Sequence, residues 1–220
     1  LADGARAEGG AGDDVGWSSA GGDLLDGGTG TDVVSYYAAT SGVAVDLAIL
    51  GAQDTLGAGI DTLSGFETLE GSRWNDALAG DGLANEIHSG DGADIVEGRD
   101  GDDVLWGEAG DDELHGGAGA DRLIGGAGAD LFDGGEGEGD VADFRGAATR
   151  VTVDLSNLGA QDTGFGQDRF IGIEAVRGGL GDDDLTGDAG SNQLWGHEGA
   201  DQLKGGGGDD VLTGGGGNDT

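Results

Sequence analysis

Residues 116–133 read GGAGADRLI followed directly by GGAGADLFD, two consecutive copies of one nine-residue unit. Glycine at the first, second and fourth places lets the backbone turn tightly, because glycine adopts left-handed conformations at little cost. The sixth place holds a carboxylate, Asp121 or Asp130, and the eighth holds one apolar side chain, Leu123 or Phe132. Each unit therefore predicts a six-residue turn followed by a three-residue strand with one buried side chain.

The same unit recurs in phase along most of the 220 residues. We divide the chain into repeat blocks and strand-rich insertions with their lead-ins: block 9–35, insertion 36–70, block 71–143, insertion 144–177 and block 178–220. We interpret them as one continuous solenoid that is a fragment of a longer chain.

The two insertions resemble each other, since VAVDL at 43–47 matches VTVDL at 151–155, 108 residues later. This match indicates a tandem duplication. The alternating apolar residues predict strands, so we expect the insertions to continue the solenoid as wider coils. Surface loops attached to the solenoid are the alternative.

Two units make a coil of 18 residues, and successive coils can stack at the inter-strand spacing of about 4.8 Å. We therefore predict an all-β fold, a right-handed parallel β-roll with two nonapeptide units per 18-residue coil and two strand-rich insertions. The eighth-place side chains should face inward and fill a thin core. Only the two ends of such a roll present open strand edges.

The composition limits the partners. The 45 acidic and 9 basic residues give a formal net charge of -36, which disfavours nucleic acid and anionic lipid and favours cations. The chain has 54 glycines, no proline and no cysteine, so it has neither a disulfide nor a thiolate metal site. The longest apolar run, 43–50, is interrupted by Asp46 and is too short to span a membrane. We expect no membrane insertion.

A tight turn that directs backbone carbonyls and a carboxylate inward is typical of a calcium site, because calcium prefers six to eight oxygen ligands. The candidate ligands are the sixth-place side chains Asp14, Asp23, Asp32, Asp76, Asn85, Asp94, Asp103, Asp112, Asp121, Asp130, Asp183, Asn192, Asp201, Asp210 and Asp219. Loops 18 residues apart lie on the same side of the roll and can share an ion, which gives about nine calcium ions. The sites with Asn85 and Asn192 should be weaker, because an amide replaces a carboxylate.

The unit Gly-Gly-x-Gly-x-Asp-x-U-x, where U is aliphatic, resembles the RTX (repeats-in-toxin, haemolysin-type) calcium-binding repeat family. Residues 61–72 also resemble the lead-in before such blocks. The resemblance implies export by the type I secretion machinery of Gram-negative bacteria, in which the chain folds on meeting extracellular calcium. We expect a secreted scaffold or spacer in a large adhesin-like or surface protein. The alternative is the C-terminal tail of a secreted protease, lipase, or polysaccharide epimerase or lyase.

No catalytic site is recognisable in the sequence. His197-Glu198 begins like the zinc motif His-Glu-x-x-His but lacks the second histidine, and His88 and His115 are predicted on opposite sheets. Nor is there a Gly-x-Ser-x-Gly elbow. We therefore expect that this chain is not itself an enzyme.

Three tryptophans, Trp17, Trp106 and Trp195, occupy the ninth place and should face outward. They could stack on a polysaccharide or contact a cell-surface partner, although single exposed apolar residues are common and we favour a simple covering role. We expect Arg99 and Arg122 to be solvated on a very acidic surface.

Overall fold

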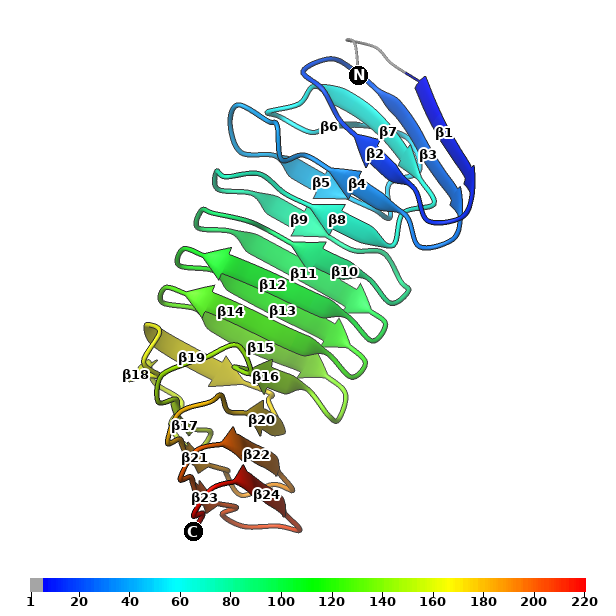
Figure 1. The fold of residues 1–220 in the computed structure, drawn as a ribbon. Helices are drawn as coiled ribbons and strands as arrows, with labels where there is room; N and C mark the ends of the chain where they lie inside the picture. The colour runs from blue at the N-terminus through cyan, green and yellow to red at the C-terminus, as the bar shows by residue number, and fades with distance from the viewer. Residues whose placement is uncertain (1–5) are drawn as a thin grey trace.

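The computed structural model describes residues 6–220, which form 24 β-strands and no helix. The strands stack as rungs from the N-terminal end to the C-terminal end (Figure 1). Over the same residues, no helix is available that could cross a membrane.

One face of the solenoid is a single parallel sheet that runs along its whole length (Figure 1). Its strands are, in spatial order, β2 (Val15–Trp17), β4 (Val33–Ser35), β8 (Thr68–Glu70), β10 (Glu86–His88), β12 (Val104–Ala109), β14 (Arg122–Ala127), β16 (Val141–Asp143), β20 (Ala175–Arg177), β22 (Gln193–Glu198) and β24 (Val211–Gly216). Within the repeats the register is 18 residues, since Leu105 lies opposite Ile87 and Leu123. The predicted coil of two units is confirmed.

The opposite face is divided into three sheets. The first contains β1 (Arg6–Ala11), β3 (Leu24–Thr29), β7 (Ile60–Ser64) and β6 (Ala52–Asp54). The second contains β18 (Gln161–Asp162), β19 (Gln167–Ile171), β15 (Leu131–Glu136), β13 (Glu113–Ala118), β11 (Ile95–Asp100), β9 (Ala77–Ala79) and β5 (Ala44–Asp46). The third contains β17 (Thr152–Asp154), β21 (Asp184–Thr186) and β23 (Gln202–Lys204).

The insertions cause these divisions. In the first, β5 pairs with β9 of the following coil, whereas β7, later in the chain, pairs with β3 of the preceding coil. The chain therefore moves forward by one coil and doubles back through β6, which is antiparallel to β7. The second insertion repeats this path, with β17 on β21, β19 on β15, and β18 antiparallel to β19. The insertions do continue the roll, but the two antiparallel pairs were not predicted.

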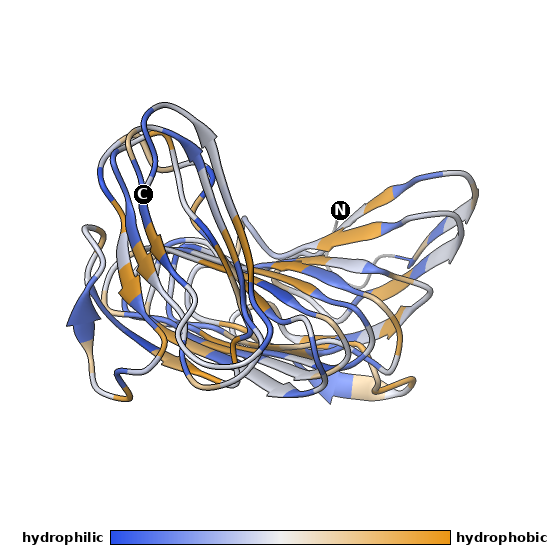
Figure 2. Cartoon of the chain, turned by 90° about the horizontal axis from the view of Figure 1, so that it is seen from below, coloured by the Kyte–Doolittle hydropathy of each residue, from blue (hydrophilic) through white to orange (hydrophobic). Residues whose placement is uncertain are grey.

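The core is a stack of single apolar side chains. Along the ribbon, hydrophobic segments recur at similar places in successive coils (Figure 2). Eleven eighth-place residues are at most 1% exposed: Leu25, Val34, Leu78, Ile87, Val96, Leu105, Leu114, Leu123, Phe132, Leu185 and Leu194. The expectation fails near the C-terminal end, where Leu203 is only partly buried and Leu212 is 45% exposed. Leu212 lies in β24, which pairs only with β22 among the strands of residues 6–220.

The insertions also supply core residues. Val43, Val45, Val151 and Val153 are at most 3% exposed, which rules out the surface-loop alternative. Phe66 from the first lead-in lies beside Gly16, an eighth place that has no side chain, and its ring comes within 3.2 Å of where a Cβ would stand. The aromatic ring therefore fills the space that the glycine leaves.

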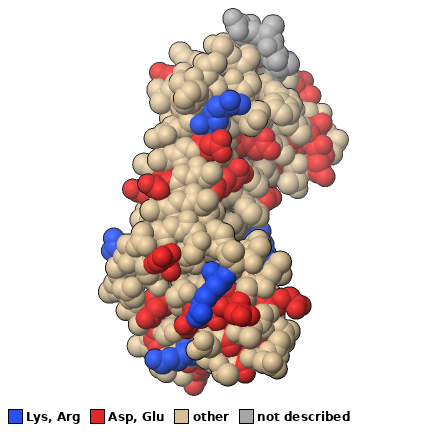
Figure 3. Space-filling model, turned by 60° about the vertical axis from the view of Figure 1, so that its left-hand side comes forward, with Lys and Arg blue, Asp and Glu red and all other residues tan. Residues whose placement is uncertain are grey.

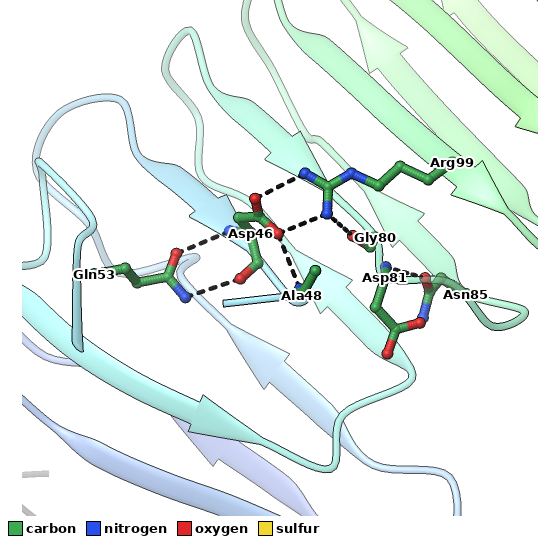
Figure 4. Close-up of polar contacts among 7 residues, drawn as sticks. All are labelled: Asp46, Ala48, Gln53, Gly80, Asp81, Asn85 and Arg99. Atoms are coloured by element: carbon green, nitrogen blue, oxygen red, sulfur yellow. Dashed lines mark hydrogen bonds and ion pairs between the residues drawn. The ribbon is translucent and has the colours of Figure 1, made fainter. Parts of the chain in front are cut away.

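Arg99 joins the first insertion to the repeats (Figure 4). Its guanidinium donates two hydrogen bonds to the Asp46 carboxylate, at 2.8 and 2.7 Å, and a third to the carbonyl of Gly80 at 2.8 Å. Gln53 holds the backbone N–H and carbonyl of Asp46 from the other side. Arg99 is thus not a merely solvated residue, because the folding path of β5 brings Asp46 to it from 53 positions away.

Candidate metal centres

The sixth-place side chains form two ladders, one on each side of the roll. In each regular rung, the N–H of one sixth-place residue donates to the Oδ1 atom of the sixth-place residue one coil later. The amides of Asp76 and Asp94, for example, donate to Asp94 and Asp112 at 2.7 and 2.9 Å. A carboxylate in each coil is therefore held at a fixed place by its neighbour.

The first ladder precedes the strands of the ten-stranded sheet and contains Asp14, Asp32, Glu67, Asn85, Asp103, Asp121, Asp140, Glu174, Asn192 and Asp210. The second precedes the strands of the opposite face and contains Asp23, Asp61, Asp76, Asp94, Asp112, Asp130, Asp168, Asp183, Asp201 and Asp219. At the insertions, Asp76 and Asp183 accept instead from the amides of Val43 and Val151.

All fifteen predicted positions lie on these ladders, and the structure adds others that sequence reasoning missed. Asp61, Asp140 and Asp168 are at most 1% exposed and accept ladder hydrogen bonds. Asp61 and Asp168 stand two residues before the buried Leu63 and Phe170, the spacing of the sixth and eighth places. This two-residue spacing was the sequence signal that could have identified Asp61 and Asp168 as ladder residues.

The second carboxylate oxygen is left without a partner in many rungs. Buried Oδ2 atoms that no donor reaches belong to Asp32, Asp94, Asp103, Asp112, Asp121, Asp130, Asp140 and Asp201. Each of these residues is at most 2% exposed. A buried carboxylate oxygen with no compensating charge or donor is costly, so the fold itself indicates that a cation belongs there.

A backbone carbonyl oxygen of the next coil lies close to the unpartnered Oδ2 atom, and both lie near the first-place glycine of the loop. A Cβ placed on Gly98 would lie 2.4 Å from Asp103 Oδ2 and 2.5 Å from the carbonyl oxygen of Gly116, one coil later. The arrangement recurs at Gly107, beside Asp112 Oδ2 and the Gly125 carbonyl. Among residues 6–220 no three acidic or histidine side chains gather into a metal site. The glycine carbonyls beside these carboxylates can complete a ligand set, and an all-oxygen set of this kind suits calcium.

Burial raises the pKa of five ladder carboxyls in the long repeat block. Desolvation is the main cause in each case, and it raises the pKa of Asp112 to about 7 and those of Asp94, Asp103, Asp121 and Asp130 to about 6. Neighbouring ladder carboxylates add to the effect, as Asp130 and Asp94 do for Asp112. The space between coils is thus strongly biased against uncompensated negative charge.

These shifts predict that acid can partly replace the cation. Because the pKa values of these five carboxyls are higher in the fold than in the unfolded chain, protonation favours the fold. This stabilisation is fully present below about pH 4 and is lost as the pH rises through 6 to 7. We therefore expect calcium-stripped protein to gain β-structure between pH 7 and pH 4, measured by far-ultraviolet circular dichroism. A loss of β-structure over that range would contradict the prediction.

The histidines and tryptophans form no second site of this kind in the described chain. His88 lies in β10 and His115 in β13, on opposite faces as predicted. The rings of Trp106 and His88 are stacked, with 5.4 Å between their centroids. The Arg122 guanidinium carbon lies 5.7 Å from the centroid of the Trp106 ring, which shows that Arg122 is not simply solvated. On the face shown in Figure 3, acidic side chains are scattered and basic ones are few.

Comparison with known families gives the same assignment. A family model for the RTX calcium-binding nonapeptide repeat (4 copies) matches residues 8–37, 79–114, 88–123, 106–141, 168–203 and 186–220. The chain belongs to this family. No curated protein matches the chain. RTX repeats bind calcium, and this β-solenoid is accordingly a structural calcium-binding domain.

The RTX loops of this chain have two conformations, which differ at the second place. In an open loop this residue has a positive φ. The second-place residues with this conformation are Gly10, Gly28, Gly90, Arg99, Glu108, Gly117, Gly126, Gly135, His197, Gly206 and Gly215. All eight unpartnered Oδ2 atoms belong to open loops.

In a closed loop the second-place residue has no positive φ, and its N–H donates to the sixth-place side chain of the same loop. The donor and acceptor pairs are Ser19 and Asp23 (2.9 Å), Ser72 and Asp76 (2.6 Å), Asp81 and Asn85 (2.8 Å), Gly179 and Asp183 (2.7 Å), and Asp188 and Asn192 (2.8 Å). Figure 4 shows the pair of Asp81 and Asn85.

Proposed function

We propose that this chain is the calcium-dependent folding module of a secreted bacterial protein. The observation that carries the proposal is the set of buried, unpartnered Oδ2 atoms stacked along both sides of the roll. The candidate ligands are the fifteen sixth-place side chains predicted from the sequence, together with Asp140. When bound, calcium supplies the positive charge that these carboxylates lack, and the chain's glycine carbonyls complete the ligand set.

Calcium-dependent folding explains how such a chain could be exported. With a formal net charge of -36, the compact chain repels itself unless cations are bound. Extracellular calcium modules typically bind calcium with dissociation constants of about 10⁻⁴ to 10⁻³ M, an affinity too weak to bind the low calcium concentration of the cytosol. A chain that stays unfolded inside the cell and folds outside it fits type I secretion and an extracellular location.

The duplicated architecture favours a scaffold or spacer in a large adhesin-like or surface protein. Both halves contain the same insertion path, and in both Asp46 or Asp154 is held at its backbone N–H and carbonyl by the Gln53 or Gln161 side chain. Repetition of a whole unit extends the solenoid without adding a new kind of site. A catalytic domain elsewhere on the same polypeptide would favour the enzyme-tail alternative instead.

The test is a calcium titration of calcium-stripped protein at pH 7.5, followed by far-ultraviolet circular dichroism. We expect a cooperative change from disorder to β-structure that calcium produces and magnesium does not, because magnesium requires a tight octahedron and retains its waters. If the stripped protein is already β-rich and calcium changes nothing, the carboxylates are not folding ligands and the proposal is wrong.

A further inference from the structure

The closed loops are not scattered along the chain. Four of the five make up two complete coils, residues 71–88 and 178–195, in which the loops on both sides are closed. These are the first full coils after the first and second insertions. The duplicated halves therefore share this feature.

In a closed loop, the side-chain oxygen that would contact calcium already accepts a hydrogen bond from a backbone N–H group. The Ser72 amide lies 2.6 Å from Asp76 Oδ2, and the Gly179 amide lies 2.7 Å from Asp183 Oδ2. An N–H group carries partial positive charge toward the oxygen it contacts, so it satisfies the carboxylate and repels a cation from the same side. In an open loop the corresponding oxygen has no such donor.

The two asparagines of these coils also replace metal contacts with hydrogen bonds. Asn85 Oδ1 accepts from the Asp81 amide, and its Nδ2 donates to the Glu67 carbonyl of the preceding coil at 3.5 Å. Asn192 does the same with Asp188 and with the Glu174 carbonyl at 3.3 Å. A carboxylate could not make this donation, so asparagine can link these coils to their neighbours without a metal.

We infer that calcium occupies only the gaps bounded by two open loops and that coils 71–88 and 178–195 assemble without metal. The inference rests on the proposed calcium-dependent function. Six gaps meet the condition: Asp14 to Asp32, Asp94 to Asp112, Asp112 to Asp130, Asp103 to Asp121, Asp121 to Asp140, and Asp201 to Asp219. The gap from Asp130 to Asp168 is not counted, although Gly164 has a positive φ, because Asp168 Oδ2 already accepts a hydrogen bond from the Thr163 hydroxyl. The sequence alone gave about nine, because it could not distinguish open from closed loops and omitted Asp140.

The first test counts the calcium ions bound to the whole chain at saturation, by equilibrium dialysis with radioactive calcium and by native mass spectrometry. We expect six ions. Nine or more would overturn the inference while leaving the proposed function intact, whereas no bound calcium would overturn the proposed function itself.

The second test uses two reciprocal substitutions in neighbouring coils of one ladder. Asp103→Asn alters an open loop and should remove one ion and raise the calcium concentration at the folding midpoint. Asn85→Asp adds a carboxylate to a closed loop and should leave the ion count at the wild-type value, even if it lowers the thermal midpoint by removing the link to Glu67. Asn192→Asp repeats the test in the second half. A gained ion in either Asn→Asp variant would refute the inference.

Discussion

Replacing Gly110 by alanine is expected to destabilise the calcium-loaded protein by about 3 to 5 kcal/mol, through backbone strain and a steric clash together. Gly110 is the fourth residue of its unit and has a φ of +147°. A Cβ at this place would lie 1.3 Å from the carbonyl oxygen of Gly92, one coil earlier. Coils 18 residues apart could then no longer stack at their present distance. Urea unfolding at saturating calcium measures the loss.

Gly12 is the matched control, because it holds the same place in the first unit and no earlier coil packs against it within residues 6–220. Its φ is +108°, and a Cβ there would meet nothing within 4 Å. Gly12→Ala should therefore cost only the backbone strain, about 1 to 2 kcal/mol. Equal losses for the two variants would show that the close approach of the coils is unimportant.

The second large effect is expected from Leu114→Ala, which removes an eighth-place side chain from the core. Leu114 is 0% exposed in β13, between Val96 and Phe132 of the adjacent strands. With one apolar residue per unit, little can move into the cavity, so the loss should be about 2 to 5 kcal/mol. The midpoint of the calcium titration should rise with it, since metal binding and folding are coupled.

Leu212→Ala is the comparison for this substitution. Leu212 holds the same eighth place, but it is 45% exposed in β24. Its truncation should cost about 1 kcal/mol or less. Thermal unfolding of both variants at the same calcium concentration gives the difference, and a larger loss at Leu212 than at Leu114 would contradict the assigned core.

Much of the site was predictable because the repeat links sequence distance to space. Once two units form a coil, residues 18 apart are neighbours, so Asp94 and Asp112 are assigned to one ladder without a structure. The same rule fails where the spacing changes. Asp121 meets Asp140 at a distance of 19 positions, and Asp130 meets Asp168 at 38. These partners depend on how the chain passes through an inserted residue or a whole insertion.

The sequence by itself determined the nine-residue period, the family, the inward side chain of each unit and the oxygen ligands that favour calcium. Those properties are local, because they follow from the residue types within one unit. Only the tertiary structure decided the forward and backward path of the insertions and the division into open and closed loops. The residue type at the second place does not decide which form a loop takes: Arg99, Glu108 and His197 are left-handed although they are not glycine, whereas Gly179 is a glycine whose N–H donates to Asp183 in a closed loop.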